Sequence, residues 1–92
     1  MNDNLIGCFA SSLAGHDKCK TYIITDADDL YVYLADGKYK LIEKPKKKKR
    51  KHVQISGIKD INIQLKQDCN SKIINEDIKR AIKEYNLCQK QM

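Results

Sequence analysis

Seven of the eight residues from Lys44 to Lys51 are basic, and the remaining one is Pro45. Charges this close together repel one another and cannot be buried in a core, so we expect a solvated loop or a contact surface for a polyanion. The whole chain has a net charge of +6, and without these seven charges it would have a net charge of −1. The basic character is therefore local to residues 44–51, which we call the basic segment.

The 92-residue chain is long enough for one compact domain and too short for two. Its longest stretch without a charged residue runs from Asn4 to His16 and is interrupted by glycines and serines. A membrane-spanning helix needs roughly 20 mostly apolar residues, and no secretion signal is visible at the start of the chain. We therefore expect a cytoplasmic protein with no membrane partner.

The cysteines and acidic residues do not have the spacing of a metal site. The four cysteines form no close pair of the kind that zinc modules use, and without an export signal we expect reduced thiols. Asp26, Asp28 and Asp29 lack the downstream glycine and glutamate of a calcium loop, so they predict a turn. We predict no metal and no cofactor.

Candidate nucleophiles are present near one histidine. Ser11, Ser12 and Cys19 lie close in sequence to His16, but no nucleophile elbow and no glycine-rich phosphate loop accompanies them. A chain of this size also offers little room for a substrate pocket. We expect a protein that is not an enzyme.

The first part of the chain is predicted to be mainly β. Alternating apolar, aromatic and β-branched residues predict five short strands, over residues 6–11, 21–25, 30–35, 38–43 and 53–56. The last of them is expected to end at Gly57. Short strands joined by tight turns favour a small closed barrel, because closure removes exposed strand edges.

Asp36-Gly37 predicts a two-residue type I′ turn in a β-hairpin. The expected cross-strand pairs are Ala35 with Lys38, Leu34 with Tyr39, Tyr33 with Lys40, and Val32 with Leu41. The face of the hairpin that points into the core would carry Val32, Leu34, Tyr39 and Leu41. The outer face would carry Tyr31, Tyr33, Lys38 and Lys40.

The last third of the chain changes to a helical period. Ile78, Ala81, Ile82 and Tyr85 line one helical face and predict a helix over residues 76–87, with Asn75 as its N-cap. Residues 58–66 fit both a strand and a helix, and we favour a helix. Residues 58–92 would then form a helical extension packed on a barrel of residues 1–57 within a single domain.

The basic segment is the main indication of function. Each lysine that neutralises an RNA phosphate releases counterions, so with about five lysines engaged the logarithm of affinity should fall with log salt at a slope of roughly −3 to −5. Two alternatives remain open for this segment: a charged loop that keeps the protein soluble, or a nuclear-import signal that begins at Pro45.

The outer face of the predicted hairpin adds aromatic rings to these charges. Tyr31 and Tyr33, beside Lys38 and Lys40, have the composition of a surface that stacks unpaired bases, at about 1–3 kcal/mol per base. The alternative, which we favour, is that both tyrosines pack against the C-terminal helix, whose apolar face needs a partner.

Residues 6–24, which read IGCFASSLAGHDKCKTYII, resemble the KOW motif of two strands around a glycine-containing loop. The order continues with LYVYLADG at residues 30–37 and KKKKRKHVQIS at residues 46–56. Residues 5–56 are similar to small KOW-domain RNA-binding proteins of low-GC Gram-positive bacteria and to the fourteenth large-subunit ribosomal protein of eukaryotes and archaea. The C-terminal stretch that begins at Asn75 is similar to the bacterial group.

This resemblance implies an SH3-like five-stranded barrel with a C-terminal α-helical extension. It also implies RNA binding, with the ribosome or its RNA as the expected partner. Gly15 matches the motif glycine, where a turn needs a positive φ or a close approach to RNA, and Lys18 and Lys20 match basic positions of the same loop.

Together these observations predict an RNA-binding protein that grips phosphates with the loop 44–52 and the loop 15–20. The alternative is a KOW adaptor that docks on a protein of the transcription or translation machinery. The predicted RNA-binding residues are Gly15, His16, Lys18, Lys20, Tyr31, Tyr33, Lys38, Lys40, Lys44, Lys46, Lys47, Lys48, Lys49, Arg50, Lys51 and His52.

Overall fold

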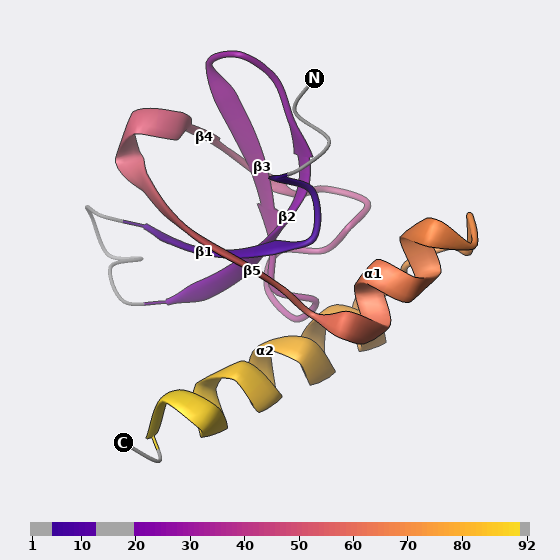
Figure 1. The fold of residues 1–92 in the computed structure, drawn as a ribbon. Helices are drawn as coiled ribbons and strands as arrows, with labels where there is room; N and C mark the ends of the chain where they lie inside the picture. Colours follow the sequence, from indigo (N-terminus) through magenta and orange to yellow (C-terminus); the bar gives the residue numbers. More distant parts are fainter. Residues whose placement is uncertain (1–4, 13–19, 91–92) are drawn as a thin grey trace.

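The computed structural model describes residues 5–12 and 20–90 (Figure 1). Its five strands form one antiparallel sheet in the order β4-β3-β2-β1-β5. The elements are β1 (Cys8–Ser12), β2 (Thr21–Ala27), β3 (Tyr31–Ala35), β4 (Lys46–Lys49), the 3-10 helix η2 (Arg50–His52), β5 (Val53–Lys59), α1 (Ile61–Asp68) and α2 (Asn75–Lys90). A mainly-β domain with a C-terminal helix, as predicted, is confirmed.

Four of the five predicted strands are present, and two of them are longer than expected. β2 continues to Ala27, and β5 continues past Gly57 to Lys59. Gly57 does not end the strand, because it lies beside an irregularity in the β1–β5 register between Cys8 and Ala10. Its φ of +76° suits the extra residues of a β-bulge.

The predicted hairpin between β3 and residues 38–43 is wrong. The Asp36 carboxylate accepts backbone N–H bonds from Lys38, Tyr39 and Lys40 at 2.9, 2.8 and 2.8 Å. These N–H groups are satisfied within the turn and do not pair with β3. The chain then forms no strand until β4. Tyr39, which was expected in the core, is 73% exposed, and Leu41 is also exposed.

The true partner of β3 is the basic segment. The register pairs Tyr31 with Lys49, Val32 with Lys48, Tyr33 with Lys47, and Leu34 with Lys46. The prediction of a loop over residues 44–52 is therefore wrong, since four of its lysines form β4 and the next three residues form η2. β4 is an edge strand, so half of its side chains can point into solvent without being buried.

Apolar side chains cover both faces of the sheet. Cys8, Ala10, Tyr22, Ile24, Val32, Leu34 and Val53 form one buried cluster. Phe9, Ile23 and Ala35, which alternate with them along the strands, form a second cluster with Ile63, Ile78 and Ala81 of the two helices. The helices therefore pack on one face only, as Figure 1 shows for α2.

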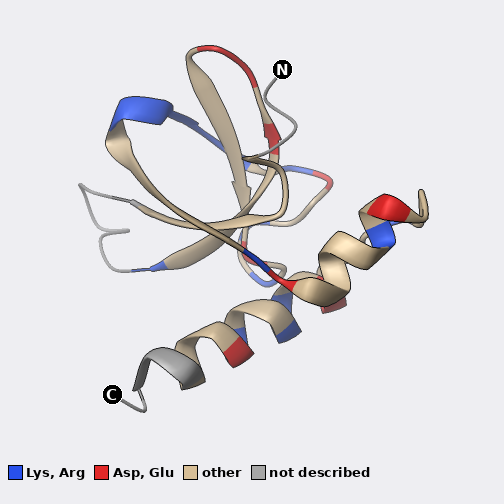
Figure 2. Ribbon diagram, in the orientation of Figure 1, with Lys and Arg blue, Asp and Glu red and all other residues tan. Residues whose placement is uncertain are grey.

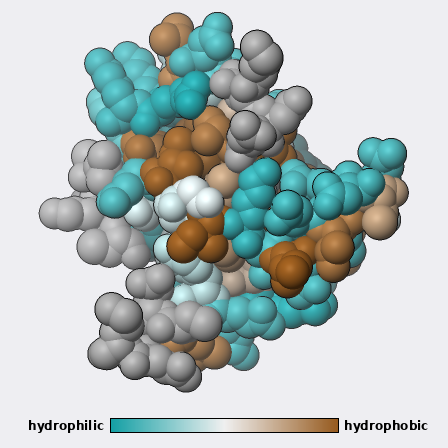
Figure 3. Space-filling model, viewed as in Figure 1, coloured by the Kyte–Doolittle hydropathy of each residue, from teal (hydrophilic) through white to brown (hydrophobic). Residues whose placement is uncertain are grey.

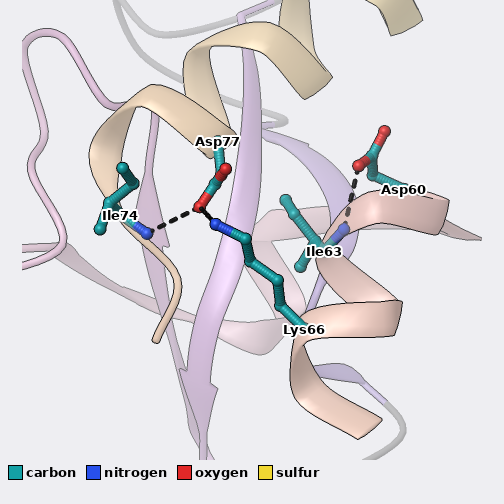
Figure 4. Close-up of polar contacts among 5 residues, drawn as sticks. All are labelled: Asp60, Ile63, Lys66, Ile74 and Asp77. Atoms are coloured by element: carbon teal, nitrogen blue, oxygen red, sulfur yellow. Dashed lines mark hydrogen bonds and ion pairs between the residues drawn. The ribbon is translucent and has the colours of Figure 1, made fainter. Parts of the chain in front are cut away.

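The predicted helix over residues 58–66 is confirmed in part as α1, which begins at Ile61. The Asp60 carboxylate accepts the Ile63 N–H at 3.1 Å and caps the helix (Figure 4). Ile63 is buried, whereas Ile61 and Leu65 are exposed. Figure 3 shows hydrophobic side chains at the surface along α1.

The predicted helix over residues 76–87 is confirmed as α2, with Ile78 and Ala81 buried against the sheet. The predicted capping role of Asn75 is wrong. Its side-chain oxygen accepts the Ile42 N–H at 2.9 Å, and its amide donates to Glu43, so Asn75 ties the loop before β4 to the helix. Within the described residues, no helix is long and apolar enough to cross a membrane.

Candidate functional site

Two tyrosines and two lysines share one face of the β3–β4 pair. The register places Tyr33 opposite Lys47 and Tyr31 opposite Lys49. Because side chains alternate along a strand, all four point away from the face that carries the buried Leu34. The Lys47 ammonium lies 4.3 Å from the centre of the Tyr31 ring, within cation–π range. We call these four residues the tyrosine–lysine face.

The lysines of β4 divide between two environments. Lys47 and Lys49 are exposed, whereas Lys46 and Lys48 are half-buried opposite the core residues of β3. Burial lowers the pKa of the Lys46 ammonium, and the neighbouring Lys48 charge lowers it further. Long lysine side chains can cover apolar surface with their alkyl stems. Two lysines therefore border the core, and the other two belong to the tyrosine–lysine face.

A pocket of about 370 Å³ lies beside this face, at the junction of β3, β4 and η2. Its volume lies within the range of roughly 300–1,000 Å³ that small-molecule sites occupy. The residues that line it are Asp29, Leu30, Tyr31, Lys49, Arg50 and Lys51. Three cations, one ring and one 70%-exposed leucine thus meet at one site.

Hydrogen bonds hold the β2–β3 turn against η2. The Arg50 backbone N–H donates to the Leu30 carbonyl at 2.9 Å, and its guanidinium donates to the Asp28 carbonyl at 3.3 Å. The Asp28 carboxylate accepts N–H bonds from Tyr31 and Leu30 at 2.7 and 2.9 Å. These bonds, and the nearby Lys47 and Arg50 charges, lower the pKa of Asp28. The predicted turn is confirmed in part, because Asp26 and Ala27 belong to β2 and only Asp28 and Asp29 lie in the turn, which positions Tyr31.

Lys38 and Lys40 do not belong to the tyrosine–lysine face. They lie in the turn after β3, where the ammonium of Lys38 is 5.1 Å from the centre of the Tyr39 ring. The prediction that these two lysines flank Tyr31 and Tyr33 is therefore wrong. Lys47 and Lys49 take their place, because the chain leaves the sheet at Asp36 and returns ten residues later.

The remaining predicted residues are spread around the sheet. Lys44 is exposed ahead of β4, Lys51 and His52 are exposed in η2, and Lys20 is exposed just before β2. Gly15, His16 and Lys18 lie outside the described residues, so the predicted contact of the loop 15–20 with RNA stays a prediction. Figure 2 shows the positive charges of β4 and η2 grouped at the end of the sheet away from α2.

Packing of Tyr31 and Tyr33 against the C-terminal helix, the alternative that the sequence favoured, is wrong. The helix packs on Phe9, Ile23 and Ala35 instead, at the opposite end of the same face. The aromatic partner of Phe9 is Tyr85, a residue of α2 itself. Both predicted stacking residues therefore remain half-exposed.

Sequence reasoning missed Leu30 and Asp29 as pocket residues. Leu30 was expected as the first residue of a strand, and nothing in its neighbours indicates that an apolar side chain is exposed there. The pairing of Lys47 and Lys49 with the tyrosines was also missed. Strict alternation across β4 would have found it, but only after the basic segment had been recognised as a strand.

The chemistry of this site suits binding of an anion that also has flat apolar surfaces. Lysine ammonium groups and an arginine attract phosphate, and the tyrosine rings offer π-faces. Within residues 5–12 and 20–90, no group of three or more His, Cys, Asp or Glu side chains is placed to hold a metal ion.

Comparisons with known proteins add no family to this description. No model of a known protein family matches the chain, and a search of curated proteins finds no match to its sequence. The functional assignment therefore depends on the geometry of the site.

Proposed function

We propose that this protein is a non-enzymatic RNA-binding protein whose tyrosine–lysine face holds an unpaired strand of RNA. The observation that supports it best is the 4.3 Å approach of the Lys47 ammonium to the Tyr31 ring beside a cationic pocket of about 370 Å³. When RNA binds, Lys47 moves from the ring to a phosphate and a base stacks on Tyr31. Stacking on aromatic rings between cations is the usual mode of single-strand binding.

We further infer that the sheet belongs to an SH3-like barrel of the KOW type. The strand order, in which β1 pairs with both β2 and β5, supports this inference. So does the direct connection of the two edge strands through the short helix η2. The resemblance to ribosome-associated KOW proteins makes ribosomal RNA the first RNA to test, and it implies a cytoplasmic location.

The test of this function is the salt dependence of RNA affinity. Fluorescence anisotropy with a labelled twelve-residue oligouridylate would be measured from 50 to 300 mM salt for the wild type and for Lys47→Gln/Lys49→Gln. For single-stranded RNA, each lost phosphate contact makes the slope of log affinity against log salt less steep by about 0.7. The slope of the double variant should therefore be less steep than that of the wild type by about 1.4. The matched control is Lys72→Gln/Arg80→Gln, which removes two exposed charges outside the face.

Co-sedimentation with ribosomes of the source organism would test the proposed partner. The wild type should pellet near physiological salt and the Lys47→Gln/Lys49→Gln variant should not. If the variant pellets as well as the wild type and both stay bound at high salt, apolar contacts hold the complex. The protein-docking adaptor would then replace the RNA-binding proposal.

A further inference from the structure

A second basic groove lies between α2 and the turn after β3, and the proposed RNA site does not include it. Its volume is about 580 Å³. Four lysines line it: Lys20 just before β2, Lys38 in the turn, and Lys79 and Lys83 on α2. In Figure 2 the positive charges of α2 lie apart from those of β4 and η2. We call this the helix groove.

The lysines of the helix groove outnumber the acidic groups that face them. Asp36, which also lines the groove, already accepts three backbone N–H bonds with its carboxylate. Glu76 pairs with Lys79 at 3.7 Å, but both side chains are exposed, and such pairs contribute little in water. The groove therefore presents a net positive field to an incoming anion.

Contacts at both ends fix the walls of the helix groove. Gly37 packs so closely on α2 that a Cβ there would lie 2.4 Å from the Asn75 carbonyl oxygen and 2.9 Å from Cγ of Lys79. At the other end, the Thr21 hydroxyl donates to the side-chain oxygen of Asn86 at 3.0 Å. A groove that is already formed loses less conformational freedom when a ligand binds.

The groove also has an exposed aromatic ring. Tyr39 lines it with a 73% exposed side chain, next to the Lys38 ammonium. On the helix side the groove is lined by the exposed Leu87 and by Ile82, which is half-buried against the second core cluster. An acidic peptide would satisfy the lysines, but it offers a flat group to the ring only where it also carries an aromatic side chain. Every nucleotide unit of RNA carries both a phosphate and a base, so RNA matches the lysines and the ring together.

We propose that the helix groove binds a nucleotide unit of RNA, with the base against Tyr39 and the phosphate held by Lys79 and Lys83. This inference rests on the proposed function and adds a second, separate contact to it. Gly37 is a positioning residue, because it lets the turn that carries Tyr39 approach the lysines of α2.

The test is a titration of the full-length ¹⁵N-labelled protein with hexauridylate, followed by NMR. Amide shifts are expected at Tyr39, Lys79, Lys83 and Asn86 as well as on the tyrosine–lysine face. Lys79→Gln/Lys83→Gln should remove the shifts in the groove and leave those on β3 and β4. Tyr39→Ala should weaken binding at the groove at least about fivefold. Lys72→Gln/Arg80→Gln again serves as the charge-matched control.

The outcomes separate this inference from the proposed function. Amide shifts confined to the tyrosine–lysine face would overturn the proposal that the helix groove binds RNA, and they would support the proposed function. An absence of shifts anywhere would overturn both. Inorganic polyphosphate is the second probe: if it binds the groove as tightly as hexauridylate and Tyr39→Ala has no effect, the groove is a simple anion site and the nucleotide assignment is wrong.

Discussion

The rings of Phe9 on β1 and Tyr85 on α2 stack with their centres 4.1 Å apart and their planes inclined by 17°. The two residues are far apart in the sequence and join the first strand to the last helix. Phe9 is 3% exposed and sits in the same cluster as Ile78 and Ala81. This stack is therefore one of the contacts that hold α2, and with it one wall of the helix groove, on the sheet.

Replacing Tyr85 by alanine should lower the free energy of unfolding by about 2 kcal/mol, through lost apolar burial and lost ring stacking. Tyr85→Phe keeps the ring and should change stability by less than about 0.5 kcal/mol. Urea denaturation followed by circular dichroism measures both values. Equal stability of the two variants would mean that the stack does not hold α2.

Asp77 makes stability depend on pH. Its carboxylate accepts the Ile74 N–H at 3.0 Å and the Lys66 ammonium at 2.7 Å, as Figure 4 shows. The Ile74 hydrogen bond is the larger cause of a pKa below the usual 3.8, and the Lys66 bond adds to it. Since the folded pKa is the lower one, this stabilisation is complete above the unfolded pKa and is lost as pH falls through the folded value.

Asp77→Asn should therefore be less stable than the wild type at pH 7, by about 1 kcal/mol. The difference should begin to shrink as pH falls below the unfolded value of 3.8, and it should be smallest below the folded pKa, where the wild-type carboxyl is neutral like the asparagine amide. Thermal unfolding between pH 7 and pH 2.5 checks this. Lys66→Gln, which leaves the Ile74 bond intact, should show a smaller effect; a constant difference across pH would contradict the role of the charge.

Gly37 and Gly57 both have positive φ, at +77° and +76°, but only Gly37 is enclosed. A Cβ on Gly57 would meet nothing within 4 Å. Gly57→Ala should therefore cost only the backbone strain, about 1 kcal/mol. Gly37→Ala adds a clash with backbone and should cost about 2 kcal/mol or more. Chemical denaturation gives the free energy of unfolding of both variants, and the difference between them measures the steric contact of residue 37 with α2. Equal losses of stability would show that the turn can move away from α2.

Tyr31 should contribute to RNA affinity through its ring and not through its hydroxyl. Tyr31→Ala should weaken binding of oligouridylate by about 1–3 kcal/mol, the usual effect of losing one stacked base. Tyr31→Phe should bind like the wild type. The anisotropy titration used for the lysine variants measures both affinities. Weaker RNA binding by the phenylalanine variant would mean that the hydroxyl contributes through a hydrogen bond, and it would contradict stacking as the role of Tyr31.

The elements that could be predicted from the sequence are those that local patterns determine. The apolar spacing of Ile78, Ala81 and Tyr85 fixed the face of α2, and alternation gave the core residues Val32 and Leu34. The pairing of β3 could not be predicted in this way. Asp-Gly is the sequence of a tight hairpin, but the Asp36 side chain bonds three backbone N–H groups and Gly37 packs on α2.

For the candidate site, the sequence located the tyrosines and the basic segment but not their contact. The choice between Lys38 and Lys47 as neighbour of Tyr31 depends on which segment occupies the edge of the sheet. Which segment occupies the edge depends in turn on α2. Asn75 of this helix bonds Ile42 and Glu43, which keeps the chain before β4 away from the sheet and leaves the edge to β4. A run of lysines has no strand pattern of its own, so its role in the sheet appears only in three dimensions.

β4 also determines how copies of this protein behave toward one another. An edge strand offers unpaired backbone groups that a second sheet can extend, which is the route to fibrous assembly. In this chain that edge consists of four consecutive lysines. Two copies aligned edge to edge would bring like charges together along the whole seam, so this edge resists association with itself. Two of these four lysines, Lys47 and Lys49, also belong to the tyrosine–lysine face, so in our proposal one strand both contacts RNA and disfavours pairing of this edge with a second copy.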